Sequence, residues 1–274
     1  MYTGRIAALA SKHDKLSLIH PPLRDLLGLE LRQAIIDTDQ FGTFSGEISR
    51  PGDMIKTAIA KARAGMREMG VPLGFASEGA IGSEGFMPIT DLEIVVFVDD
   101  EAGFHVAEAS SSCNIVARSW KFDEGAPIDE ELMRSGFPEH GLIVRLQTVT
   151  TGPVFKGIHD RQTLFAAIRQ LEAHHPNEIV IESDLRANHC PSRRPHIASA
   201  AERLALRLTR TCPSCNCPGW GEGRKIRGRR CASCDAPTFV VLGHIDGCAL
   251  CGVEQEVVTD PSPVDPSNCP FCNP

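Results

Sequence analysis

The sequence contains no apolar run close to the roughly 20 residues that a membrane-spanning helix needs. Its first residues, MYTGRIAALASKHDK, lack the charged, apolar and small-residue order of a secretion signal. Positively charged residues are also fewer than negatively charged ones, since 28 Lys and Arg and 35 Asp and Glu give a net charge of −7. These absences argue against membrane contact and against nucleic-acid binding through overall positive charge. We therefore expect a cytoplasmic protein.

Cysteine is distributed very unevenly along the 274 residues. Nine of the eleven cysteines follow residue 211, and eight of these form four CxxC pairs. Without a secretion signal, this pattern indicates metal thiolates rather than disulfides. Two CxxC turns supply the four sulfur ligands that structural zinc prefers. The sequence thus predicts two structural zinc ions held by Cys212, Cys215, Cys231, Cys234, Cys248, Cys251, Cys269 and Cys272.

The spacing of the pairs favours sequential sharing of the metals, the first pair with the second and the third with the fourth. Fifteen residues separate Cys215 from Cys231 and 17 separate Cys251 from Cys269, as in zinc ribbons. A crossed arrangement, first with third and second with fourth, stays open. An iron–sulfur cluster is a lesser alternative, because the close cysteine triplet of ferredoxins is missing. Cys217 is interpreted as a bystander, although it could replace Cys215 as a ligand.

Strand-like and helix-like patterns alternate through residues 1–208. This alternation predicts an α/β domain with a mixed sheet and flanking helices. We expect it to span residues 1–209, followed by a small double zinc-ribbon module over residues 210–274. At 274 residues, about two domains is also the expectation from length alone.

Residues 37–82 stand out because a polar loop, a helix, a buried strand and a Gly-rich turn follow one another. Asp53 is a candidate N-cap of the helix and Gly70 a candidate C-cap. The strand Val71 to Ala76 then leads to Glu78 and Gly79. A carboxylate at the end of a buried strand, followed by Gly, is a usual position for a metal–phosphate site in an α/β fold.

This layout resembles the non-canonical purine nucleoside triphosphate pyrophosphatases, the inosine/xanthosine triphosphate pyrophosphatase-like group, over roughly residues 3–208. The segments that carry the resemblance are Ser11 to Lys15, Thr43 to Glu47, Lys61-Ala62, Glu78-Gly79 and Ser192-Arg193. The whole chain also resembles a family of bacterial proteins with a cysteine-rich tail, and that resemblance implies no activity.

The first resemblance implies hydrolysis of a nucleoside triphosphate or a related phosphorylated compound, with Mg or Mn as cofactor. Catalytic acids would then be Glu78, Glu47 and Asp53. Residues that contact the substrate would be Ser11, Lys15, Thr43, Ser192 and Arg193. Among these, Lys15 and Arg193 would balance phosphate charge.

A second hypothesis is a non-enzymatic binding protein. Five cations lie within Arg224 to Arg230, between the first two CxxC pairs, and could contact nucleic acid or an acidic protein. Only Trp220 accompanies them as an aromatic, which gives little support for base stacking. Lys56 also stands where the pyrophosphatases carry a metal-binding acid, which favours this second hypothesis. A homodimer is a further expectation.

Overall fold

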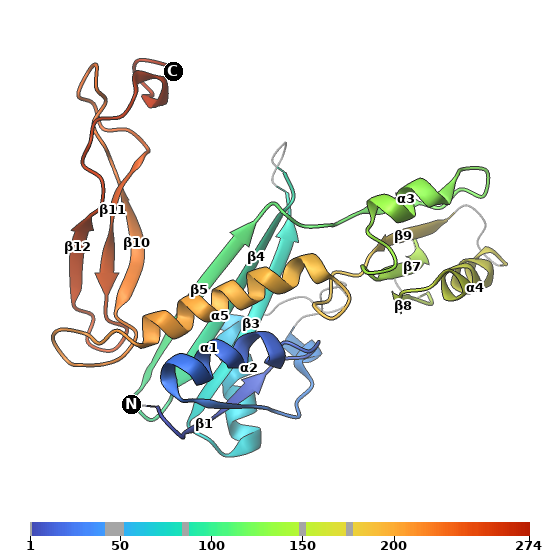
Figure 1. Cartoon of the computed structure of the whole chain (residues 1–274), viewed down its shortest axis with the longest axis horizontal. Coiled ribbons are helices and arrows are strands. Elements are labelled where there is room, and N and C mark those ends of the chain that lie inside the picture. Colours follow the sequence, from blue (N-terminus) through green and yellow to red (C-terminus); the bar gives the residue numbers. More distant parts are fainter. Residues whose placement is uncertain (1, 42–51, 84–87, 148–151, 174–177) are drawn as a thin grey trace.

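The computed structural model describes residues 2–41, 52–83, 88–147, 152–173 and 178–274. Within these ranges the chain forms three separate sheets (Figure 1). Two lie before residue 209 and are covered by helices, and the third belongs to the cysteine-rich segment. The predicted mixed α/β character is confirmed, whereas the pattern of the sequence did not show that residues 1–209 contain two sheets. The domain boundary at residue 209 stays a prediction.

The largest sheet has five strands in the order β2-β1-β3-β4-β5. The strand β1 is parallel to β2 and to β3, whereas β4 is antiparallel to β3 and to β5. The sheet is therefore mixed, as expected. Its strands are β1 (Ile6–Ala10), β2 (Glu30–Gln33), β3 (Leu73–Gly82), β4 (Thr90–Asp99) and β5 (Phe104–Ser112).

Helices cover both faces of the five-stranded sheet because its strands carry apolar side chains on both sides. Phe75 and Phe97 belong to the core that α1 (Leu16–Leu27) and α5 (Arg194–Leu208) cover. Ala76 and Val96 belong to the core under α2 (Met54–Met69). This alternation decides which polar residues of β3 and β4 face which helix.

The expected caps of α2 are confirmed. The Asp53 side chain accepts the Lys56 amide at 2.8 Å, and Gly70 ends the helix with φ of 64°. The helix α1 runs through Pro21 and Pro22, although proline usually interrupts a helix. Tertiary packing outweighs their low helix propensity, since Ile19 and Leu23 are fully buried and α1 packs along α5.

The second sheet is antiparallel, with the order β6-β9-β7-β8. It is inserted between β5 and α5, and α3 (Ile128–Arg134) and α4 (Arg161–Glu172) lie beside it (Figure 1). Its strands are β6 (Ser119–Lys121), β7 (Leu142–Leu146), β8 (Phe155–Ile158) and β9 (Ile179–Ser183). Residues 113–118 connect it to β5 of the large sheet, and residues 184–193 connect it to α5.

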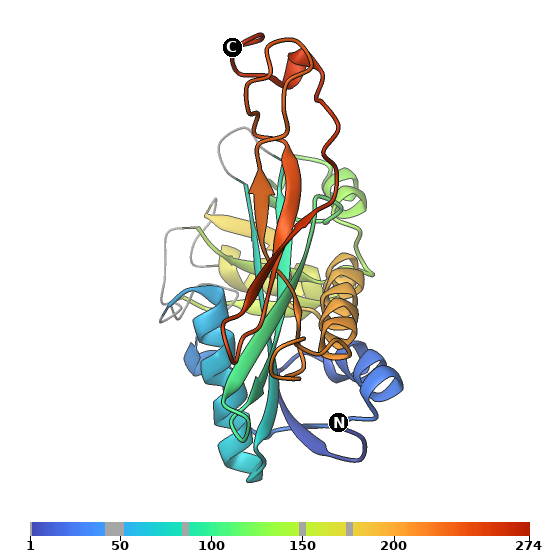
Figure 2. The same cartoon turned by 90° about the vertical axis from the view of Figure 1, so that its left-hand side faces the viewer.

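The third sheet forms an elongated module at the end of α5 (Figures 1 and 2). Its three antiparallel strands follow the order β10-β11-β12, with bounds Gly221–Arg227, Val241–Gly247 and Glu254–Val258. Cys212, Cys217 and Cys248 share a buried core with Tyr2 and Leu208. The module is therefore packed against the large sheet at one end. Among the described residues, no helix has the length and apolar character to cross a membrane.

Candidate functional site

The four CxxC pairs fold into closely similar turns. In each, the amide of the residue after the second cysteine donates to the carbonyl of the first, at 2.9 to 3.1 Å. The residues at this position are Asn216, Asp235, Gly252 and Asn273, and the first three have positive φ. Asn, Asp and Gly tolerate this backbone conformation best. The turns aim two sulfur atoms to one side, as a shared metal requires.

The eight cysteines gather into two groups, and within each group the four sulfur atoms lie within 4.8 Å of one another. Distances between sulfur atoms of partner turns are 3.6 to 3.8 Å. A zinc–sulfur bond of about 2.3 Å places the corners of a tetrahedron about 3.8 Å apart. Both groups therefore fit zinc. Four thiolates fill the coordination sphere, so each ion would be structural.

The grouping is crossed, and the favoured sequential pairing was wrong. Cys212 and Cys215 meet Cys248 and Cys251, while the remaining turns form the second group with Cys231, Cys234, Cys269 and Cys272. One strand lies between each pair of consecutive turns. A seven-residue strand spans about 20 Å, so consecutive turns lie at opposite ends of the sheet. Only alternate turns can share a metal.

We call the group with Cys212 the proximal centre and the group with Cys231 the distal centre. Cys217 joins neither group, and its thiol donates to the Pro218 carbonyl at 3.4 Å. It is buried in the core shared with Tyr2. Its interpretation as a bystander therefore agrees with the geometry.

A second cluster of chemically active groups lies around β3 and β4. Six ionisable residues there are more than nine-tenths buried: Lys15, Lys61, Glu78, Asp91, Glu93 and Arg193. Charged side chains are rarely buried unless they are paired. We call this set the buried charged cluster.

On the α2 face of the sheet, the cluster consists of Glu78 and Lys61. Lys61 of α2 donates to the Glu78 carboxylate of β3. Glu78 was expected as a metal ligand at the end of its strand, and the structure places it within β3 beside a lysine. The lysine belongs to the Lys61-Ala62 step that the sequence resemblance included.

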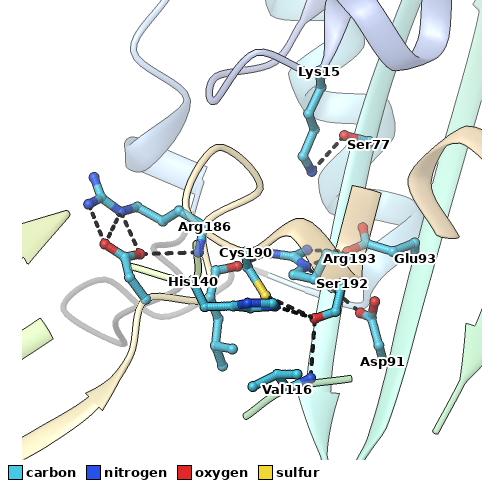
Figure 3. A network of polar contacts seen from close by, with 12 residues as sticks. Lys15, Ser77, Asp91, Glu93, Val116, His140, Arg186, Cys190, Ser192 and Arg193 are labelled. Atoms are coloured by element: carbon cyan, nitrogen blue, oxygen red, sulfur yellow. Dashed lines mark hydrogen bonds and ion pairs between the residues drawn. The ribbon is translucent and has the colours of Figure 1, made fainter. Parts of the chain in front are cut away.

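On the opposite face, the cluster is formed by Lys15, Ser77, Glu93 and Arg193 (Figure 3). The ammonium of Lys15 donates to the Ser77 hydroxyl at 3.0 Å. Burial lowers the pKa of Lys15, although the nearby Glu93 carboxylate opposes this shift. Arg193 donates to Glu93 at 2.7 Å through Nε and also to the Leu185 carbonyl. Lys15 and Arg193, which are 178 residues apart in sequence, therefore lie close together, and both interact with Glu93.

Asp91 completes this face. It is fully buried, and neither of its carboxylate oxygens has a hydrogen-bond partner. One oxygen lies 3.9 Å from Arg193 Nε. Burial, with help from the neighbouring Glu93 charge, raises the pKa of Asp91 to about 7. The Oε2 atom of Glu93 is likewise buried without a partner. Buried carboxylate oxygens that lack hydrogen bonds are costly and therefore point to a functional role.

Ser192 lies at the edge of this network (Figure 3). Its hydroxyl accepts the Val116 amide at 3.1 Å and lies 3.2 Å from His140 Nε2. Ser192, in the segment 184–193, therefore contacts both the segment 113–118, through Val116, and the loop before β7, through His140. Ser11 is buried after β1, and its hydroxyl donates to the Lys12 carbonyl at 3.1 Å.

The other predicted site residues lie elsewhere or outside the described ranges. Asp53 caps α2 and pairs with Lys56 at 3.2 Å. Thr43 and Glu47 lie outside the described residues. Within the described ranges, only the two cysteine groups bring three or more metal-ligand side chains together. The described acids near β3 therefore do not fit Mg or Mn by themselves, and we derive no step through either ion.

Sequence reasoning missed Asp91 and Glu93, which begin a strand that is otherwise rich in Val and Ile. The alternation Asp91-Leu92-Glu93-Ile94 was a usable signal, because it places two acids on one face of a buried strand. Their partner Arg193 was identified only through the family resemblance.

A family model described as "Domain of unknown function (DUF6671)" matches residues 61–274, more than half of the chain. No curated protein and no solved structure gives a significant match. The resemblance to the purine nucleoside triphosphate pyrophosphatases is therefore not confirmed. The matched range includes all eight cysteines of the two centres and most of the buried charged cluster.

Proposed function

Because the chain belongs to the DUF6671 family, whose description states no activity, we propose a function from the geometry of the two sites. The α/β part is a hydrolase of a nucleoside triphosphate or a related phosphorylated compound. The two zinc ions are structural and brace the C-terminal module against it. The observation that carries this proposal is the buried charged cluster, in which three carboxylate oxygens of Asp91 and Glu93 lack hydrogen bonds.

The cluster supports the proposal because such an arrangement is expensive to maintain. Each buried charge loses hydration, and the pairs regain only part of that cost. Residues from four distant segments nevertheless meet there: Lys15, Lys61, Asp91 with Glu93, and Arg193. Strongly perturbed groups in such clusters are candidates for catalysis.

The members of the cluster suit different tasks in hydrolysis. Lys15 and Arg193 supply positive charge for a phosphate group. Asp91 has a pKa near 7, so it can take up or release a proton at neutral pH, as a general base must do when water attacks. Glu78 lies on the other face of β3 and holds Lys61 in place.

The alternative function, binding of a polyanion through Arg224 to Arg230, receives less support. Arg224, Lys225 and Arg229 pair with acids of the same module, namely Glu254, Glu222 and Asp260. Arg227 and Arg230 donate to backbone carbonyls. Most of the positive charge of this run is therefore balanced within the module.

The test is release of phosphate or pyrophosphate from a panel of nucleoside triphosphates with Mg or Mn. Wild type is compared with Glu78→Gln, Asp91→Asn and the control Asp53→Asn. The first two variants should lose release, and the control should keep it. Asp91→Asn is the safer variant because no hydrogen bond to Asp91 is lost. Folded variants that hydrolyse as fast as wild type would refute the proposal.

A further inference from the structure

A cavity of about 440 Å³ lies beside the four-stranded sheet. This volume falls within the range of small-molecule sites. Alternation along β7 turns Leu142 and Val144 toward the core shared with α4, so Ile143 and Arg145 face the other way and line the cavity. The cavity therefore occupies the sheet face opposite the helices.

The cavity is positively charged although the chain is acidic. Four cations and two acids line it, for a formal charge of +2 among the lining residues, whereas the whole chain carries −7. One of these cations, Arg118, also pairs with Glu131, which lies outside the lining. The acids are Glu182 and Asp184, and the cations are Arg118, Arg145, Lys156 and Arg186. A concave site with this charge attracts anions.

Two of the cations are held in fixed positions. Glu182 accepts two hydrogen bonds from Arg145, both at 2.9 Å. Asp184, which is fully buried, accepts from Arg186 and also from the Gly157 amide at 2.9 Å. Such paired, preorganised guanidinium groups are suited to oxyanion ligands because little side-chain freedom is lost on binding.

The remaining wall is apolar and is formed by Ile89, Ala117, Ile143 and Leu185. Leu185 also connects the cavity to the buried charged cluster, because its carbonyl accepts from Arg193. A ligand that fills the cavity would therefore place its charged end among the cations and its apolar part against this wall.

We propose that this cavity binds a phosphorylated compound that carries a ring, as a nucleotide does. Its phosphate contacts the cations, and its ring packs on Ile143 and Leu185. The identification of this ligand with the compound that is hydrolysed rests on the proposed function. Binding itself does not, so the two claims can fail separately.

The test is calorimetric titration with AMP and GMP, beside ribose 5-phosphate and inorganic phosphate, without divalent metal. Wild type should bind at least one nucleotide about tenfold more tightly than ribose 5-phosphate, because the ring adds apolar contact. Arg118→Ala/Lys156→Ala should weaken nucleotide binding at least tenfold. Arg118 can be removed safely, since its partner Glu131 also pairs with Arg134. The two single variants replace the double variant if it does not fold.

Lys121→Ala is the matched control, because Lys121 follows Ser119 on the same sheet face but does not line the cavity. It should change affinity less than twofold. No nucleotide binding, equal affinity for ribose 5-phosphate, or equal effects in the control and the double variant would overturn the proposal.

Measurements of turnover separate this inference from the hydrolase proposal. Binding without hydrolysis keeps the cavity assignment and refutes the enzyme. If folded Arg118→Ala/Lys156→Ala hydrolyses the compound with an unchanged KM, the hydrolase proposal stands and the cavity assignment is refuted. Asp91→Asn should bind the nucleotide like wild type, since Asp91 does not line the cavity.

Discussion

Arg193 and Arg194 are adjacent in sequence but lie in opposite environments. The Arg193 side chain is 1% exposed and pairs with Glu93, whereas that of Arg194 is 30% exposed and pairs with Asp14 at 3.2 Å. Breaking a buried pair leaves an uncompensated charge, while a surface pair contributes little.

Replacing each arginine by Met should therefore give very different results. We expect Arg193→Met to lower the free energy of unfolding by about 3–5 kcal/mol. Arg194→Met should lower it by less than about 1 kcal/mol. Urea titration of both variants measures the difference. Equal losses would show that Arg193 is not the buried partner of Glu93.

Asp91 should make stability depend on pH in a defined direction. Its pKa is about 7 in the folded protein, compared with 3.8 for an aspartate that is free in water. The folded state therefore holds a proton that the unfolded state has lost, so this contribution to stability falls from about pH 4 to pH 7 and is then constant. Facing Asp91 are Glu93, Arg193 and Lys15, the other charged groups that shift its pKa.

When the pH is raised from 6 to 8, the free energy of unfolding of wild type should fall by about 1 kcal/mol more than that of Asp91→Asn. The comparison with the variant removes the pH dependence of the zinc thiolates, which both proteins share. Urea titrations at both pH values supply the numbers. A variant as pH-dependent as wild type would contradict the buried, protonated state of Asp91.

The sequence singled out Lys15, Glu78 and Arg193 as site residues, and their roles stay predictions. That these three lie around β3 and β4 could not be predicted from the sequence. No functional role was assigned to Asp91 and Glu93 from the sequence, because the Val and Ile residues that follow them predicted only a buried strand. Pairings such as that of Glu93 with Arg193 join residues 100 positions apart, and periodicity carries no information about them.

Among the secondary-structure elements, β3 contains a glycine that the buried charged cluster requires. A Cβ atom at Gly79 would lie 2.8 Å from the Glu93 carboxylate oxygens and even closer to the Arg193 guanidinium. At Gly82, three residues later in the same strand, a Cβ atom would meet nothing within 4 Å.

Gly79→Ala should thus destabilise the protein by about 1–3 kcal/mol through overpacking. It should also reduce turnover, since Arg193 must move. Gly82→Ala should leave the thermal midpoint and turnover nearly unchanged. Thermal unfolding and phosphate release test both variants. Similar behaviour of the two would mean that the guanidinium does not lie against β3.

Local rules explain which element predictions succeeded. Both caps of α2 follow from short-range chemistry of Asp53 and Gly70. Continuity of α1 through Pro21 and Pro22 depends on packing against α5, which lies more than 160 residues later. Predicting the crossed cysteine groups would also have required the strand lengths, because β10, β11 and β12 place successive CxxC turns at opposite ends of the sheet.

In the whole molecule, the proximal and distal cysteine centres are unequal. Cys212 and Cys248 of the proximal centre lie in the core with Leu208 of α5, whereas no cysteine of the distal centre does. Arg207 of α5 further fixes the proximal end by donating to the Gly219 carbonyl at 2.9 Å. Removing the entire module would therefore disturb the α/β part as well.

We predict that Cys248→Ser reduces amide-exchange protection in α5 and β5, because loss of the proximal zinc loosens a shared core. Cys269→Ser should reduce protection only in the module. Hydrogen exchange followed by mass spectrometry distinguishes the two patterns. Loss of protection in α5 with Cys269→Ser would show that the centres are equivalent.

The arrangement of the three sheets could not be predicted from the sequence. Periodicity identified strands, but the pairing of β1 with β3 and of β6 with β9 joins segments about 60 residues apart. The cysteine-rich module could be predicted as a unit, because metal ligands have a fixed spacing in the sequence.

Zinc counting by native mass spectrometry tests the crossed module most directly. Two variants each lose two turns: Cys212→Ser/Cys215→Ser/Cys248→Ser/Cys251→Ser and Cys212→Ser/Cys215→Ser/Cys231→Ser/Cys234→Ser. Wild type should carry two zinc ions, the first variant one, and the second none, because it damages both centres. One zinc ion in the second variant and none in the first would contradict the crossed pairing and restore the sequential one.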